Sequence, residues 1–111
     1  MAPDRIAAIA RLVGPGEWAT YGDIALVALG GRGARVVGAV AARGGIANAH
    51  RVLLAGGRIS PGGESGRVEA CRRRLEAEGI GFRGAVADPR RRVTWLDLAA
   101  RAAAPATLGS T

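Results

Sequence analysis

TYGDIALVALGGRGARVVGAVAAR, residues 20–43, is the most informative stretch of the chain. Thr20 can cap a helix over about residues 21–29, because its hydroxyl can accept a hydrogen bond from a free N–H in the first turn. The glycines of residues 30–33 predict a tight turn, and a second helix over about residues 34–43 follows. Two short helices joined by a turn of three or four residues are typical of a helix-turn-helix.

Weaker patterns predict the elements on either side of this motif. Apolar residues at helical spacing after Asp4 predict an N-terminal helix that ends at residues 14–16, where glycine and proline alternate. Downstream we expect a strand over residues 50–55, a helix between Ser65 and Glu78 stopped by Gly79, and a short strand or turn over residues 93–98. Buried positions are expected at Trp18, Val68, Cys71, Leu75 and Trp95.

These patterns predict one α/β domain that is mostly helical, with a winged-helix-like helix-turn-helix and a short strand element. A chain of 111 residues has the length of a single domain. The domain is expected over residues 1–100. Residues 101–111 are expected to form a disordered tail, because RAAAPATLGST has no packing pattern.

The chain carries a strong positive charge. Sixteen basic residues, all of them arginine, face nine acidic ones, and the net charge is +7. The arginine guanidinium is a planar fork of donors that suits phosphate groups and guanine edges. A basic excess of this size favours a polyanion, nucleic acid first, over the alternative of ordinary surface charge.

One cysteine and one histidine limit the available chemistry. A single cysteine cannot form an internal disulfide, and the two residues are too few for a structural zinc site. No cofactor or metal is therefore expected. The N-terminus carries charges within its apolar stretch, and no apolar run is long enough to span a membrane. We expect a monomeric intracellular protein, cytoplasmic and nucleoid-associated.

Several segments carry a family resemblance. They are PGEWATYGDIA (residues 15–25), GARVVGAV (residues 33–40), AHRVLLAGGRIS (residues 49–60) and RRLEAEGI (residues 73–80). In this order and at this spacing they resemble the C-terminal DNA-binding domain of the O6-alkylguanine-DNA alkyltransferases. The resemblance covers about residues 4–98 and implies that family's fold and its binding to duplex DNA.

The nucleophile of that family is missing. Its Pro-Cys-His-Arg-Val segment corresponds to Asn-Ala-His-Arg-Val at residues 48–52, so Ala49 stands in the place of the reactive cysteine. A methyl group has no lone pair with which to attack an alkyl carbon. The chain thus resembles the alkyltransferase-like proteins, most of which carry tryptophan at this position. This implies a non-enzymatic protein that binds O6-alkylguanine in DNA by nucleotide flipping and marks it for nucleotide-excision repair proteins.

The resemblance also implies roles for individual residues. Arg35 matches the arginine finger that enters from the minor groove and replaces the flipped base. Tyr21 matches the tyrosine that helps to rotate the target nucleotide, and His50 with Glu78 matches a hydrogen-bonded pair that is structural here. Further DNA contacts are expected from Thr20, Ala34 and Gly38, and the lesion pocket is expected to consist of Tyr21, Ala49, Ser60 and Arg67.

The residues alone leave other functions open. A helix-turn-helix transcriptional regulator would read an undamaged sequence in the major groove. An alkyltransferase would act through Cys71, although its apolar neighbours favour core packing. A degenerate relative would contact only another repair protein. Arg35 as a plain phosphate contact and Tyr21 as a half-buried aromatic are the simpler roles for those two side chains.

Overall fold

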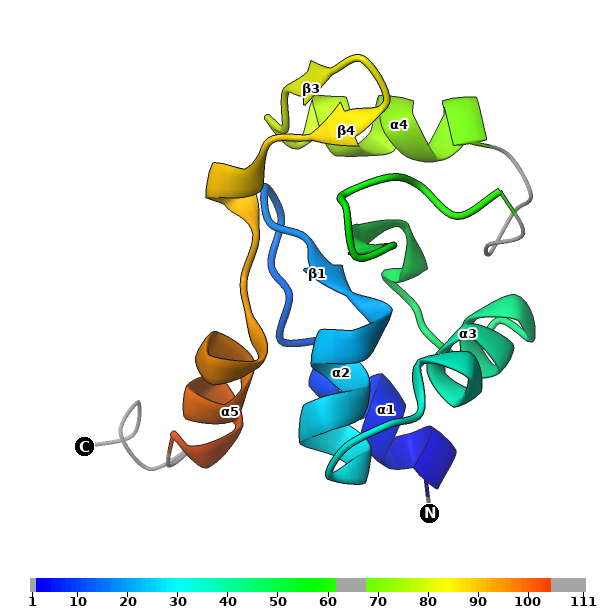
Figure 1. Ribbon diagram of the computed structural model, residues 1–111, viewed down its shortest axis with the longest axis vertical. Helices are drawn as coiled ribbons and strands as arrows, with labels where there is room; N and C mark the ends of the chain where they lie inside the picture. The colour runs from blue at the N-terminus through cyan, green and yellow to red at the C-terminus, as the bar shows by residue number, and fades with distance from the viewer. Residues whose placement is uncertain (1, 62–67, 105–111) are drawn as a thin grey trace.

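Helices α2 (Tyr21–Leu29) and α3 (Ala34–Ala42) form the predicted helix-turn-helix in a computed structural model that describes residues 2–61 and 68–104. The chain bends by 106° between the two helices, as is typical of this motif. Helix α1 (Ala2–Ala10) packs against both (Figure 1). No single helix in the described ranges is long and apolar enough to cross a membrane, and only the bent pair of α2 and α3 meets those two criteria.

Local interactions explain where α2 begins and how the chain turns into α3. The Thr20 hydroxyl accepts a hydrogen bond from the Asp23 N–H (3.0 Å), and the Asp23 carboxylate accepts one from the Thr20 N–H (3.2 Å). This capping box confirms the predicted cap. Before α3, Gly33 has a φ of 144°, and a β-carbon there would lie 2.6 Å from the Leu29 side chain. Only glycine fits at that position.

The remaining elements are short. Strands β1 and β2 pair in parallel, and β3 and β4 form an antiparallel hairpin. The predicted mostly helical α/β fold is confirmed, although the strand expected over residues 50–55 is a turn of 3-10 helix followed by only two strand residues. The bounds are β1 (Ala19–Thr20), 3-10 helix η1 (Ala49–Arg51), β2 (Val52–Leu53), α4 (Val68–Ala77), β3 (Phe82–Arg83), β4 (Val86–Ala87), 3-10 helix η2 (Pro89–Arg91) and α5 (Trp95–Ala103).

The core consists of two apolar clusters. The larger one joins α1, α2 and α3 around the fully buried Ile6, Ile24 and Val37. The smaller one, which includes Trp18 and Leu75, lies beneath α4 and the hairpin, at the opposite end of the molecule from α1 and α5 (Figure 1). Two predicted buried positions on α4 differ: Cys71 is only partly buried, and Val68 is 40% exposed at the first residue of the helix.

Helix α5 corrects two predictions about the end of the chain. A strand or turn was expected over residues 93–98, but Thr94 and Asp97 form a capping box that begins a helix there. The helix continues through residues 101–103, which were expected to belong to a disordered tail. Arg101 fixes this last turn by pairing with Glu17 at 2.7 Å. Residues 105–111 lie outside the described residues.

The two tryptophans have different environments. Trp18 is 2% exposed, as predicted, and its indole N–H donates a hydrogen bond to the Asp88 carbonyl (2.8 Å). Its backbone N–H donates to the Arg91 carbonyl, and its carbonyl accepts from the Val93 N–H. Trp95 is 42% exposed, so its predicted core position is wrong. It is the first residue of α5, and that helix buries Leu98 instead.

The segment after the hairpin clamps the start of α2. Arg92 makes a bidentate contact with the Asp23 carboxylate (2.9 and 3.0 Å), and the Trp95 N–H donates to the same carboxylate (3.1 Å). Asp23 is 4% exposed, so its charge depends on these donors for stabilisation. The C-terminal segment therefore holds the first helix of the helix-turn-helix.

Substituting Arg92 with alanine is expected to lower the free energy of unfolding by about 2 kcal/mol, because hydrogen bonds to a buried carboxylate are lost. Urea unfolding followed by fluorescence of the buried Trp18 measures the change. Arg90→Ala is the matched control: Arg90 pairs with Asp88 but is 88% exposed, so no measurable change is expected. Equal stability of the two variants would contradict the clamp.

Candidate nucleic-acid interface

Helix α3 presents a stripe of small residues to solvent. Arg35, Gly38, Ala39 and Ala42 follow at intervals of three or four residues and therefore share one face. Three of them are exposed and Gly38 is partly exposed, whereas Val40 on the opposite side is buried. A β-carbon at Gly38 would meet nothing within 4 Å, so packing within the molecule does not require glycine there. A face of this kind can approach another surface closely.

Arg35 is the one long side chain on this stripe. It is exposed, and in the part of the chain that the structure describes it makes no hydrogen bond or ion pair. Its neighbours Ala34 and Val36 are also exposed. Arg43, which follows α3, is exposed and unpaired over the same described ranges. The guanidinium of Arg35 is thus available for a partner outside the molecule.

Tyr21 and Thr20 have different accessibility. Tyr21, the first residue of α2, is partly buried, and its side chain shares a hydrogen bond with Ser60. Burial raises the pKa of the Tyr21 hydroxyl, so the group is protonated at neutral pH. Thr20 is 4% exposed and its hydroxyl caps α2. The Thr20 hydroxyl therefore has a structural role in the fold, and a DNA contact of Thr20 stays a prediction.

The segment that would carry the nucleophile, η1, packs against α4. Ala49 begins η1 and is 6% exposed. The Cys71 thiol donates a hydrogen bond to the carbonyl of His50 (3.4 Å). Sequence reasoning did not include Cys71 in the predicted lesion pocket. Arg67, which it did include, lies outside the described residues.

Glu78 is the centre of a hydrogen-bonded network beneath this segment. Its carboxylate accepts hydrogen bonds from Arg51 Nη2 (2.8 Å), Arg51 Nε (3.0 Å) and His50 Nε2 (2.9 Å). The hydrogen bonds from Arg51 are the main reason that the pKa of Glu78 is lowered to about 2. Burial lowers the pKa of His50, so the neutral imidazole donates through Nε2. The predicted pairing of His50 with Glu78 is present.

Asn48 connects the same segment to α1. Its amide nitrogen donates hydrogen bonds to the carbonyls of Ala10 (2.9 Å) and Val13 (3.1 Å), and Arg51 donates to Val13 as well (3.1 Å). Carbonyls at a helix end lack a full set of partners within the helix, and Asn48 supplies a second donor to Ala10, whose carbonyl also accepts from the Val13 N–H (3.1 Å). Sequence reasoning missed this role. The only signal was a polar residue at a position where the related family carries proline.

The exposed small-residue face of α3, its protruding arginine and the net charge of +7 define a helix-turn-helix domain that binds DNA. A family model described as "6-O-methylguanine DNA methyltransferase, DNA binding domain" matches residues 2–80. The chain belongs to this family, and DNA is its partner. Neither a curated protein nor a solved structure matches it. The β3–β4 hairpin and α5 lie beyond the matched residues.

Proposed function

We propose that this protein recognises O6-alkylguanine in duplex DNA without reacting with it, and that it marks the lesion for nucleotide-excision repair. The observation that carries the proposal is Ala49, which is buried next to His50 at the position of the family's nucleophile. A methyl side chain cannot accept an alkyl group. The hydrogen-bonded pair of His50 and Glu78 is present, so the segment keeps its supporting contacts but has no nucleophile at position 49.

Nucleotide flipping is the mode of recognition that the residues support. A base that leaves the duplex leaves a gap in the stack, and a flat cation such as Arg35 can fill it. The small residues along α3 allow the helix to lie close to the minor groove, and Tyr21 packs against the apolar cluster that includes Ala49. Contacts between arginines and phosphates supply affinity, which should fall as the salt concentration rises.

The test is the affinity for a duplex that contains one O6-methylguanine, compared with the same duplex unmodified, at about 0.15 M salt. Lesion recognition predicts at least about tenfold tighter binding to the modified duplex. Equal affinity for the two duplexes would contradict the proposal. If equal affinity came with preference for one undamaged sequence, the protein would be a transcriptional regulator.

Cys71 gives a second candidate function, alkyl transfer, because its sulfur lies 3.4 Å from the carbonyl oxygen of His50. That hydrogen bond requires the protonated thiol, whereas the nucleophile is the thiolate, so we favour the non-covalent reading. The intact mass of the protein after incubation with the modified duplex separates the two. An unchanged mass is expected, and a gain of one methyl group on Cys71 would establish the transferase.

A further inference from the structure

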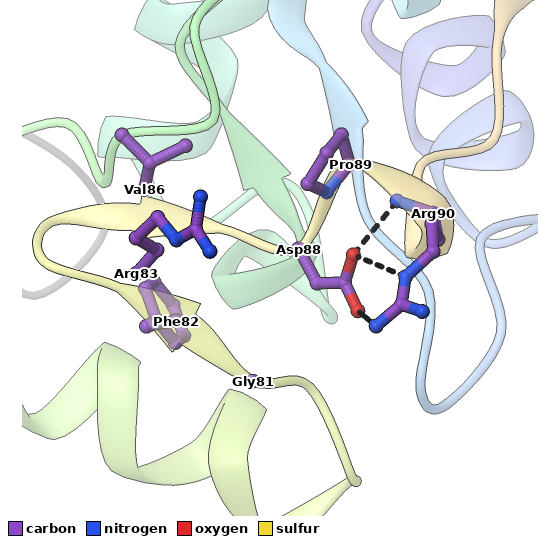
Figure 2. A pocket seen from close by; sticks show the side chains of 7 residues that line it. All are labelled: Gly81, Phe82, Arg83, Val86, Asp88, Pro89 and Arg90. Atoms are coloured by element: carbon purple, nitrogen blue, oxygen red, sulfur yellow. Dashed lines mark hydrogen bonds and ion pairs between the residues drawn. The ribbon is translucent and has the colours of Figure 1, made fainter.

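The β3–β4 hairpin lies at the end of the molecule away from α3 (Figure 1), and its residues line two hollows. A groove of about 350 Å³ lies against α4 and is walled by Leu54, Ile59, Val68 and Phe82. A second hollow of about 750 Å³ lies along the hairpin, and Phe82 lines it too (Figure 2). The match to the DNA-binding family ends at residue 80, so Phe82 and the rest of the hairpin lie outside it.

The groove has a fixed apolar wall. Leu54 is 39% exposed and Val68 is 40% exposed, so two large aliphatic side chains stand partly in solvent. The Arg72 guanidinium lies 4.6 Å from the centre of the Phe82 ring and donates a hydrogen bond to the Gly84 carbonyl (2.8 Å). These contacts hold the aromatic ring between the hollows. Two partly exposed aliphatic side chains and one aromatic ring therefore face the same groove.

Each hollow is lined by one exposed arginine whose side chain has no hydrogen-bond or ion-pair partner among the described residues. Arg58 lines the groove and Arg83 lines the second hollow. Both are exposed, and within the described ranges neither side chain makes a hydrogen bond or ion pair. Asp88 lies in the second hollow, but its charge is already paired with Arg90 at 3.1 Å (Figure 2). The hairpin surface therefore combines apolar walls with positive charge.

We propose that this hairpin surface binds an acidic segment of another protein, with a large apolar side chain of that segment seated against Leu54, Val68 and Phe82. Charge complementarity argues for an acidic partner. A second copy of the chain is disfavoured because each copy carries a net charge of +7. Duplex DNA is disfavoured because phosphate contacts need cations and leave an apolar wall unused.

Residues 59–61 connect this surface to the side of the molecule that carries Tyr21. Ile59 and Pro61 line the groove, and Ser60 between them bonds with Tyr21. A partner in the groove would therefore lie beside the DNA contacts without covering α3. The proposal does not depend on lesion recognition, because binding of the partner is measured in the absence of DNA.

The test uses the fluorescein-labelled peptide Glu-Glu-Leu-Glu-Phe-Glu-Glu and the full-length protein. We expect saturable binding that moves the methyl NMR signals of Leu54, Ile59 and Val68. Arg58→Glu should weaken the peptide affinity by about tenfold. Arg73→Glu, an equal charge change at an exposed site on α4 that lines neither hollow, should weaken it much less. Both variants should retain similar affinity for duplex DNA.

Several outcomes would overturn the proposal. The first is no binding of the peptide, and the second is equal affinity when serine replaces both apolar residues of the peptide. The third is an equal loss of peptide affinity in Arg58→Glu and Arg73→Glu, because that result would indicate only long-range attraction between charges. A loss of duplex affinity in Arg58→Glu that exceeds the loss in Arg73→Glu, with peptide binding unaffected, would assign the surface to DNA instead.

Discussion

Replacing Glu78 with glutamine is expected to lower the free energy of unfolding by about 3 kcal/mol, because a largely buried ion pair loses one partner. The Glu78 side chain is 19% exposed and that of Arg51 is 16% exposed. The amide keeps one acceptor oxygen but leaves the Arg51 guanidinium without its countercharge. The network joins the end of α4 to η1, so its loss affects contacts on both sides. Urea unfolding measures the change.

Glu76→Gln is the matched control for this substitution. Glu76 also pairs with an arginine, Arg72, but the two side chains are 46% and 39% exposed. Pairs that are exposed to this extent contribute little, so the change should stay within about 0.5 kcal/mol. If the two variants unfold at the same urea concentration, the network around Glu78 does not stabilise the fold as proposed.

The Glu78→Gln substitution should also change how the stability of the protein depends on pH. The pKa of Glu78 falls from 4.5 to about 2 in the folded protein, chiefly because Arg51 hydrogen-bonds to the ionised carboxylate. Glu78 therefore stabilises the fold fully above pH 4.5, and this contribution is lost as the pH falls from 4.5 toward 2. The parent protein should lose more stability over this interval than the Glu78→Gln variant. Parallel pH profiles would contradict the assignment.

The parts of the fold that were predicted from sequence depend on neighbouring residues. Thr20 and Asp23 are three positions apart, and this spacing of residue types is typical of the capping box that they form at the start of α2. Gly30 ends the same helix in the left-handed conformation. Ala49 was recognised because the residues around it match a family motif. Each of these inferences needed only a short window of sequence or a resemblance.

The parts that were missed depend on contacts between distant residues. Arg92 reaches Asp23 across 69 positions, and nothing local to residues 93–98 indicates that α5 would dock there. Thr94 and Asp97 do form a local capping box, the same pattern that was read correctly at Thr20. The difference is that the apolar residues after Thr94 are too few to distinguish a helix from a strand by spacing alone.

The candidate site divides in the same way. Arg35 could be singled out because it matches the arginine finger of the related family, and its exposure agrees with an outward role. Cys71 could not be placed beside His50, because the two residues are 21 positions apart and belong to different elements. Sequence spacing orders the residues within α2, α3 and α4, but packing between these helices decides which of them meet.

Arg35→Ala is expected to weaken binding to the O6-methylguanine duplex by about 10- to 100-fold, because the gap left by the flipped base is no longer filled and its unstacking is not offset. The affinity of the variant for the unmodified duplex should fall less. Arg43→Ala is the matched control, since Arg43 is also exposed beside α3. Arg43→Ala should weaken binding to both duplexes by the same factor. It should also reduce the salt dependence of binding by the equivalent of about one phosphate contact. If Arg35→Ala behaves in that second way, Arg35 is a phosphate contact and the flipping mechanism loses its central residue.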